Sequence, residues 1–155
     1  MGVEENKEVV RGYFSGFDDE FHRQIQTAED QDAEIARLTR IHRSKYLSPD
    51  IVIHSTRGVQ SFENSTQEMI TWKNAMPDLT FQIEDMIAAE DKVITRYSAY
   101  GTFTNDYGPY PPTGKEFKFV DGITISKVAD GKIIEIWGTG DTYSFMQQLG
   151  AIPTN

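Results

Sequence analysis

An Asp-Gly pair in the last third of the chain constrains the fold more than any other short feature. Asp130 and Gly131 lie between two apolar-rich runs, and an Asp-Gly pair accepts the positive φ angles of a type I′ hairpin turn. The second run leads through Trp137 to Asp141, and a short helix that ends at Gly150 follows. The pattern predicts a β-hairpin and then a helix, with a carboxylate where the strand meets the helix.

The chain before this hairpin changes its apolar period from about 3.6 residues to 2. Helical spacing occurs over residues 4–17, 32–46 and 65–76, and strand-like runs occur over residues 51–54, 79–89 and 92–103. Ser65 and Glu68 fit a capping box at the start of the third helix. Helices followed by a meander of long strands predict an α+β fold. We expect a cone-shaped, strongly curved, mainly antiparallel sheet, with N-terminal helices closing a central pocket.

Length and charge narrow the class of protein. At 155 residues the chain is expected to form one domain over residues 1–155, with an extended helical segment at about 16–46. Its 24 acidic and 15 basic residues give a formal net charge of −9, which disfavours nucleic acid and anionic membranes as partners. Without cysteine there is no disulfide or thiolate ligand, and the three histidines show no metal-ligand spacing. No signal peptide or membrane-spanning run is found, so a cytoplasmic protein is expected.

Several short motifs occur in order along the chain: Asn6-Lys7, AMPDL at 75–79, VITRY at 93–97, PPTGK at 111–115, Glu135, Trp137 and Leu149-Gly150. Together they resemble the SnoaL-like polyketide cyclase (ester cyclase) family, which belongs to the nuclear transport factor two-like superfamily. The resemblance covers about residues 69–150 and the first helix. It implies a cone-shaped α+β barrel that is often a homodimer and needs no cofactor. Family cyclases close a ring of an aromatic polyketide ester by intramolecular aldol addition, with an aspartate as acid and base, and the matching position is Asp141.

Two features depart from the family pattern. The segment 16–46 is longer than the family usually has between the first helix and the first strand. Phe103 stands where many members have a histidine after Gly-Thr. Both departures fall on residues expected to line or cover the pocket, so the substrate is not carried over from the family.

Asp141 itself has two interpretations. Together with Thr142 it can cap the N-terminus of the terminal helix, a common role for aspartate. A catalytic role requires a desolvated carboxyl, because an exposed one with a pKa of about 4 is a poor proton donor at neutral pH. An aromatic neighbour such as Trp137 would supply that desolvation.

The register of the hairpin predicts which side chains share a face. A two-residue turn places Ser126 opposite Glu135 and Thr124 opposite Trp137. The mixed face, which is the expected pocket wall, then holds Thr124, Ser126, Glu135, Trp137, Thr139 and Asp141. The other face, which is the expected core, holds Ile123, Ile125, Ile134 and Ile136. A bulge at Gly138 or Gly140 would break this phase.

The remaining candidates each have a structural alternative. Arg96 is either a surface ion-pair partner or a donor to a substrate carbonyl. His54 and Tyr100 lie in strand-like runs, where packing explains them as well as binding does. The predicted substrate-binding residues are Arg96, His54, Tyr100, Trp137, Thr124 and Phe103. Residues 105–115, which are rich in proline and tyrosine, are expected to shape the pocket mouth.

These observations and the resemblance predict a cyclase or isomerase without cofactor or metal. Its substrate would be a polyketide-like or polycyclic carbonyl compound, and Asp141 would carry the proton. A hydrolase or dehydratase using the same pocket is an alternative within enzymes. A small-molecule-binding or dimeric scaffold protein is the alternative from another class, and it predicts an exposed Asp141 that only caps the helix.

Overall fold

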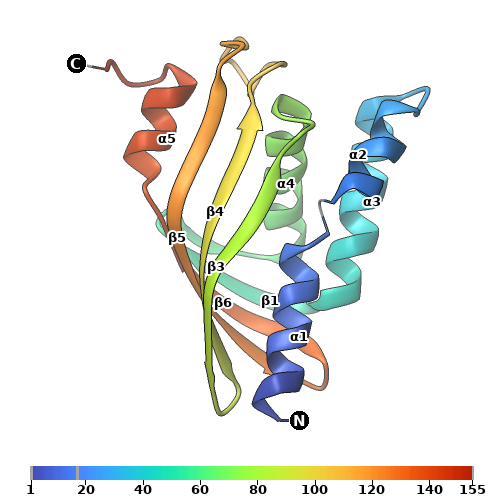
Figure 1. Cartoon of the computed structure of the whole chain (residues 1–155), viewed down its shortest axis with the longest axis vertical. Coiled ribbons are helices and arrows are strands. Elements are labelled where there is room, and N and C mark those ends of the chain that lie inside the picture. Colours follow the sequence, from blue (N-terminus) through green and yellow to red (C-terminus); the bar gives the residue numbers. More distant parts are fainter. Residues whose placement is uncertain (1, 17, 155) are drawn as a thin grey trace.

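The structure is a computed structural model that describes residues 2–16 and 18–154. These residues form five helices and six strands (Figure 1). In chain order the elements are α1 (Val3–Phe14), α2 (Asp19–Gln26), α3 (Gln31–Tyr46), β1 (Leu47–Ser55), β2 (Gly58–Gln60), α4 (Phe62–Ala75), β3 (Thr80–Ala89), β4 (Lys92–Thr102), β5 (Glu116–Ala129), β6 (Lys132–Thr139) and α5 (Thr142–Leu149). Phe17, the last residue of the first predicted helix, lies outside the described residues.

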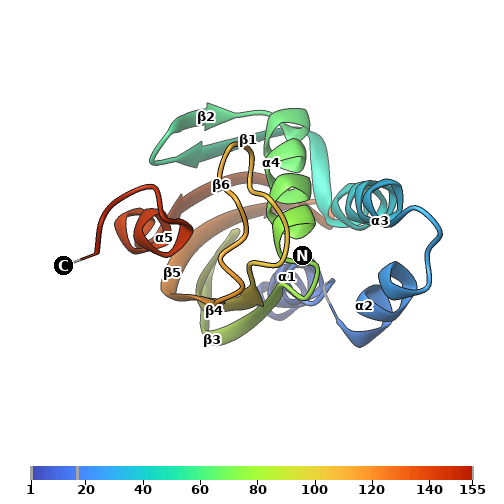
Figure 2. The ribbon, with the colours of Figure 1, turned by 90° about the horizontal axis from the view of Figure 1, so that it is seen from above.

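The strands form one sheet in the order β2-β1-β6-β5-β4-β3. All neighbouring strands are antiparallel except β1 and β6, which are parallel. The sheet curves strongly around α4, with α1 below it and α3 and α2 beyond (Figure 2). The predicted fold class is therefore confirmed, and its hollow side faces the helices.

The predicted Asp-Gly hairpin is confirmed, but its register is not. Asp130 and Gly131 have φ angles of 52° and 76°, as a type I′ turn requires. The pairing then shifts between Lys127 and Val128, because Ile134 forms a β-bulge in β6. One extra residue moves every later side chain to the other face of the sheet.

After the bulge, Ser126 lies opposite Ile136 and Thr124 opposite Gly138. The inner face therefore combines Thr124 and Ser126 with Ile136. Glu135 and Trp137 lie on the outer face, where Trp137 pairs with Ile125. The predicted division into a mixed face and an isoleucine face was wrong from this point on.

The outer face carries an apolar row that crosses five strands. Paired positions link Ile87, Ile94, Ile125, Trp137 and His54. Ile87 and Ile94 are exposed, whereas the inner-face residues Val93 and Ser126 are buried. Trp137 stacks on His54 with ring centroids 5.3 Å apart.

Two helix boundaries differ from the prediction. Helix α4 begins at Phe62, where the side chain of its N-cap Ser61 accepts a hydrogen bond from the Asn64 amide. Ser65 and Glu68 therefore lie inside the helix, and the predicted capping box there was wrong. Helix α2 lies within the predicted helical segment 16–46 but was not predicted as a separate helix; Asp18 caps it, and its two buried side chains, Phe21 and Ile25, are four residues apart.

Helix α1 and the residues that follow it lie close to α3. A Cβ atom on Gly12 would lie 2.4 Å from the ring of Tyr46, and one on Gly16 would lie 2.1 Å from the ring of His42. A side chain at either position would have to displace the ring beside it. The closeness of α1 and α3 brings Tyr13 within reach of Arg43, which matters for the site below.

Candidate functional site

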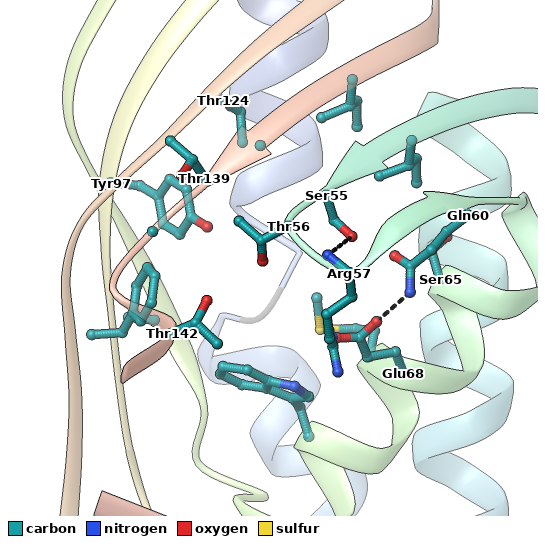
Figure 3. Close-up of a pocket in the computed structure, with 18 of the residues that line it drawn as sticks. Ser55, Thr56, Arg57, Gln60, Ser65, Glu68, Tyr97, Thr124, Thr139 and Thr142 are labelled. Atoms are coloured by element: carbon teal, nitrogen blue, oxygen red, sulfur yellow. Dashed lines mark hydrogen bonds and ion pairs between the residues drawn. The ribbon is translucent and has the colours of Figure 1, made fainter. Parts of the chain in front are cut away.

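A cavity of about 310 Å³ lies between the hollow side of the sheet and the helices (Figure 3). This volume is in the range of small-molecule sites. Most of its wall is aromatic or apolar: Phe14, Ile53, Met69, Trp72, Phe81, Ala99, Phe119, Ile136, Phe145 and Met146. Polar side chains gather on two sides, with Gln60, Arg57 and Glu68 on one and Thr139, Thr142 and Tyr97 on the other.

The sheet side of the wall is built around Tyr97. Its ring lies 5.1 Å from Phe14 and stacks on Phe119 at 6.1 Å. Burial raises the pKa of Tyr97 to about 12, so the phenol is neutral at physiological pH. Glycine makes room for these rings, since a Cβ atom on Gly122 would lie 2.5 Å from Tyr97 and one on Gly140 would lie 2.0 Å from Phe119.

The outer part of the cavity contains an arginine whose charge is neutralised by a glutamate. Arg57, at the turn between β1 and β2, pairs with Glu68 of α4, and their side chains are 58% and 24% exposed. Gln60 donates a second hydrogen bond to Glu68, with Nε2 2.6 Å from Oε2. The carboxylate therefore already has a positive charge and an amide donor beside it.

The inner part contains Arg43 of α3, which is 2% exposed. Its Nε donates to Thr66 Oγ1 at 2.9 Å, its Nη2 to Ser65 Oγ at 2.7 Å and its Nη1 to Tyr13 Oη at 2.9 Å. All three partners are neutral hydroxyl groups. Among the described residues, no carboxylate forms an ion pair with Arg43.

Two further basic side chains lie behind this part of the cavity. Lys73 of α4 is 1% exposed, and its Nζ lies 4.0 Å from the ring centroid of Phe21. Burial, with a smaller contribution from the charge on Arg43, lowers the pKa of Lys73 to about 5. Burial also lowers the pKa of His42, whose Nε2 lies 2.8 Å from the Tyr13 carbonyl oxygen.

The sequence model of the SnoaL-like polyketide cyclase family matches residues 42–149, more than two thirds of the chain. The protein belongs to this family. A search of curated protein sequences found no match.

Solved structures with the same fold share little sequence with this SnoaL-like protein. AclR from Streptomyces galilaeus, for which a hydroxylase activity has been suggested, has a TM-score of 0.76 at 22% identity, over 99% of this chain and 86% of AclR. A suggested SnoaL-like polyketide cyclase from Jannaschia sp. CCS1 has a TM-score of 0.71 at 18% identity, over 97% and 95% of the two chains. IdmH from Streptomyces antibioticus, a suggested polyketide cyclase, has a TM-score of 0.70 at 22% identity, over 94% and 98%. At these identities the likeness shows the fold alone.

Asp141, the position that matches the family aspartate, lies at the edge of the cavity. It is exposed, and its carboxylate accepts a hydrogen bond from the Ser144 amide at 2.9 Å, as the N-cap of α5. Its neighbours Gly140 and Thr142 both line the cavity, whereas Asp141 is not among the lining residues. Its catalytic role stays a prediction.

Of the predicted binding residues, Thr124 and His54 line the cavity. The His54 ring, however, stacks on Trp137, and its Nε2 lies 2.7 Å from Glu135 Oε2. These two partners belong to the outer face of the sheet. Thr124 is therefore the predicted binding residue that the structure brings most directly to the inner wall.

The other predicted binding residues are not among those that line the cavity. Arg96 is 42% exposed on the sheet and pairs with Asp85 at 2.6 Å and Asp121 at 2.8 Å. Phe103 is buried in the core around Phe117, while Tyr100 and Trp137 lie on β4 and β6. The binding roles of these four residues stay predictions.

Sequence reasoning predicted Thr124, Thr139 and His54 but missed other polar residues of the cavity, above all Arg43, Arg57 and Glu68. One signal could have found Arg43. The buried stripe of α3 consists of Ile35, Thr39 and Arg43 at intervals of four, so an arginine occupies a core position of an amphipathic helix. A buried arginine needs a partner, and that need marks a site.

Two absences concern the part of the chain that the structure describes. Residues 2–16 and 18–154 contain no group of three or more His, Asp or Glu side chains that could hold a metal ion. Within the same residues, every helix is too short or too polar to cross a membrane.

Proposed function

We propose that this protein is a cofactor-independent cyclase or isomerase acting on a polyketide-like or polycyclic carbonyl compound. The observation that carries the proposal is the cavity, in which an aromatic wall surrounds a few polar groups in a chain of the SnoaL-like family. Aromatic walls suit a flat polycyclic ligand, and the few polar groups would fix its orientation. The reaction would be an aldol-type ring closure or a related proton transfer.

We propose Asp141 as the carboxylate that carries the proton. It lies between two residues that line the cavity, so a substrate that fills the cavity would cover it. Loss of water raises the proton affinity of a carboxylate. The carboxylate would take a proton from the carbon beside a carbonyl group, and the resulting enolate carbon would attack a second carbonyl carbon. The same proton would then return to the new alkoxide oxygen, so the reaction needs no other reactant.

The proposal is tested by proton exchange on a simple ketone. In D₂O, 2-tetralone exchanges its α-protons through its enol or enolate, and NMR follows the loss of their signal. We expect the wild type to accelerate this exchange and Asp141→Asn to slow it by about 10²-fold or more, as for loss of a general base. Glu63→Gln, which removes an exposed carboxylate on α4, is the matched control and should leave the rate unchanged.

Glu68→Gln completes the comparison, because Glu68 is the carboxylate that lines the cavity. If only this variant loses the exchange, the proton carrier is Glu68, and the assignment to Asp141 fails while the function stands. If the wild type does not accelerate exchange of bound tetralone, the acid-base function itself fails. A dehydratase would also exchange the proton beside a carbonyl group, whereas hydrolysis requires no such exchange, and product analysis distinguishes these reactions.

The second candidate is a binding protein without chemistry. The observation that favours it is the exposed carboxylate of Asp141, which serves as the N-cap of α5. In this case 2-tetralone would bind in the cavity, and its α-protons would exchange at the rate seen without protein. The same exchange experiment, with binding of 2-tetralone followed by NMR titration, therefore separates the two candidates.

Association as a homodimer and a cytoplasmic location remain proposals from the family resemblance. The exposed row of Ile87 and Ile94 on the outer face of the sheet is the surface that a second copy would cover. This row is on the opposite side of the sheet from the cavity.

A further inference from the structure

The guanidinium of Arg43 is a buried charge whose partners are neutral. Transfer of an ion from water to a protein interior is costly unless another charge and hydrogen bonds replace the water. Here Ser65, Thr66 and Tyr13 supply three hydroxyl oxygens, and none of the described carboxylates supplies the charge. Arginine cannot avoid the cost by losing its proton, because a guanidinium stays protonated in proteins.

The contacts of Arg43 leave part of its donor capacity unused. A guanidinium has five N–H donors, and three different nitrogens of Arg43 each donate once. One N–H on Nη1 and one on Nη2 are left for a ligand. These are the positions from which arginine binds a planar two-oxygen group with two parallel hydrogen bonds.

Arg43 also lies at the wall of the cavity. Arg43, Ser65 and Tyr13 all line the cavity described above, together with the aromatic wall of Phe14 and Tyr97. The Tyr13 ring lies 5.8 Å from the guanidinium carbon and covers one side of it. A ligand anion that reached Arg43 would thus lie in an apolar surrounding, where charge-assisted hydrogen bonds are strong.

A purely structural role of Arg43 does not explain why a charged side chain is buried at this position. Arg43 does connect α1, α3 and α4 through its three hydroxyl partners. A neutral side chain could make such connections without the cost of burying a charge. The other cavity arginine, Arg57, already pairs with Glu68 and so offers no uncompensated charge.

We propose that Arg43 binds a planar, delocalised oxyanion of the ligand at the inner end of the cavity. The oxyanion is a carboxylate or the enolate of a β-dicarbonyl group, which share two oxygens in one plane and one negative charge. This inference rests on the proposed function for its substrate class, a carbonyl compound with a flat hydrocarbon body. It adds that the substrate is an anion, or becomes one, and that its charged end enters first.

The first test compares two ligands of one shape. We would titrate the wild type with 2-naphthoate and with 2-naphthamide by calorimetry at pH 7.5. We expect naphthoate to bind at least about 10-fold more tightly, as for a charge-assisted bidentate contact. Arg43→Met should lose this preference. The matched control is Arg40→Met, a surface arginine of the same helix, which should keep the preference.

A second pair of probes separates the two sources of the anion. At this pH, 4,4,4-trifluoro-1-(2-naphthyl)butane-1,3-dione is largely an enolate, whereas its methyl analogue is largely neutral. Preference for the fluorinated compound over naphthoate assigns the enolate, and the opposite order assigns the carboxylate. Equal affinity within both pairs overturns the proposal, as does an anion preference that survives in Arg43→Met.

A measurement on the wild type covers the case in which Arg43→Met does not fold. The Nε–Hε NMR signal of Arg43 should shift on addition of naphthoate and stay in place on addition of naphthamide. An unchanged signal at saturating naphthoate contradicts the proposal. Naphthoate has no α-proton to exchange, so its binding does not depend on catalysis. Failure of the tetralone experiment and failure of the anion site can therefore be told apart.

Discussion

Basic side chains on the surface of helices α3 and α4 have different partners from basic side chains in the interior of the same two helices. On the surface, Arg37 pairs with Glu34, and Arg40 pairs with Glu63 at 2.8 Å. In the interior, Arg43 and Lys73 are almost completely buried, and Arg43 contacts hydroxyl groups in place of a carboxylate. The surface arginines are thus paired with carboxylates, whereas the buried Arg43 is bound by neutral groups.

The three buried basic side chains, Lys73, His42 and Arg43, differ in whether they stay protonated at neutral pH. Burial lowers the pKa of Lys73 to about 5 and also lowers that of His42, so both lose their proton readily. Arg43 cannot do so, because a guanidinium stays protonated. Of these three side chains, Arg43 is therefore the one that brings positive charge to the cavity at neutral pH.

The largest effect is expected from Lys73→Met, which removes the buried amine and keeps an apolar chain. The unfolded state binds a proton on Lys73 below its ordinary pKa of 10.5, whereas the folded state does so only below about 5. The wild type therefore loses stability relative to the variant as the pH falls from about 10 to 5. At pH 7 we expect the free energy of unfolding to rise by about 2–4 kcal/mol.

Urea unfolding of both proteins at several pH values measures this difference. The matched control is Lys45→Met, which removes an exposed lysine from the end of α3 and should give no such trend with pH. A stability difference between wild type and Lys73→Met that is the same at pH 6 and pH 9 would contradict the neutral state of Lys73.

The second effect concerns His42 and the close approach of α1 to α3. In Gly16→Ala the new Cβ atom would lie 2.1 Å from the imidazole ring and must displace it. Overpacking of this kind costs about 1–3 kcal/mol of unfolding free energy. The displaced ring gains water, so the pKa of His42 should rise toward its ordinary value of 6.5.

An NMR titration of the His42 ring measures that pKa. In the wild type the lowered pKa of His42 means that the unfolded state takes up its proton first, so stability falls as the pH drops below about 6.5. Gly16→Ala should weaken this dependence. Gly2→Ala is the control, since nothing lies within 4 Å of the new Cβ atom. An unchanged pKa in Gly16→Ala would show that the ring is not held by this contact.

The sequence predicted the parts of the fold that local chemistry determines. The Asp130-Gly131 turn and the C-terminal Gly150 of α5, with a φ angle of 87°, follow from what these residues allow in the backbone. The bulge at Ile134 could not be predicted, because no residue there requires it. It depends on how β6 pairs with two strands at once, β5 and the parallel β1.

The candidate site was less predictable, for a related reason. A Ser-x-x-Glu pattern fits the start of a helix, yet Ser65 and Glu68 lie inside α4 and reach the cavity. The sequence left Arg96 as either a donor to a substrate carbonyl or a surface ion-pair partner, and the outer face supplies Asp85 and Asp121 beside it. In each case the role depends on residues far away in the chain, which periodicity does not reveal.

The smallest effect is expected at the surface, where Arg40→Met breaks the pair with Glu63. Such pairs contribute little, because both groups are well solvated in the unfolded chain and salt screens their attraction. We expect the urea midpoint of unfolding to fall by less than about 0.3 M at low salt, and the difference to vanish at high salt. Glu63→Gln should behave in the same way. A loss as large as that of Gly16→Ala, or one that persists at high salt, would mean that the surface arginines are also part of the core. The distinction between solvated surface arginines and the buried Arg43 would then be wrong.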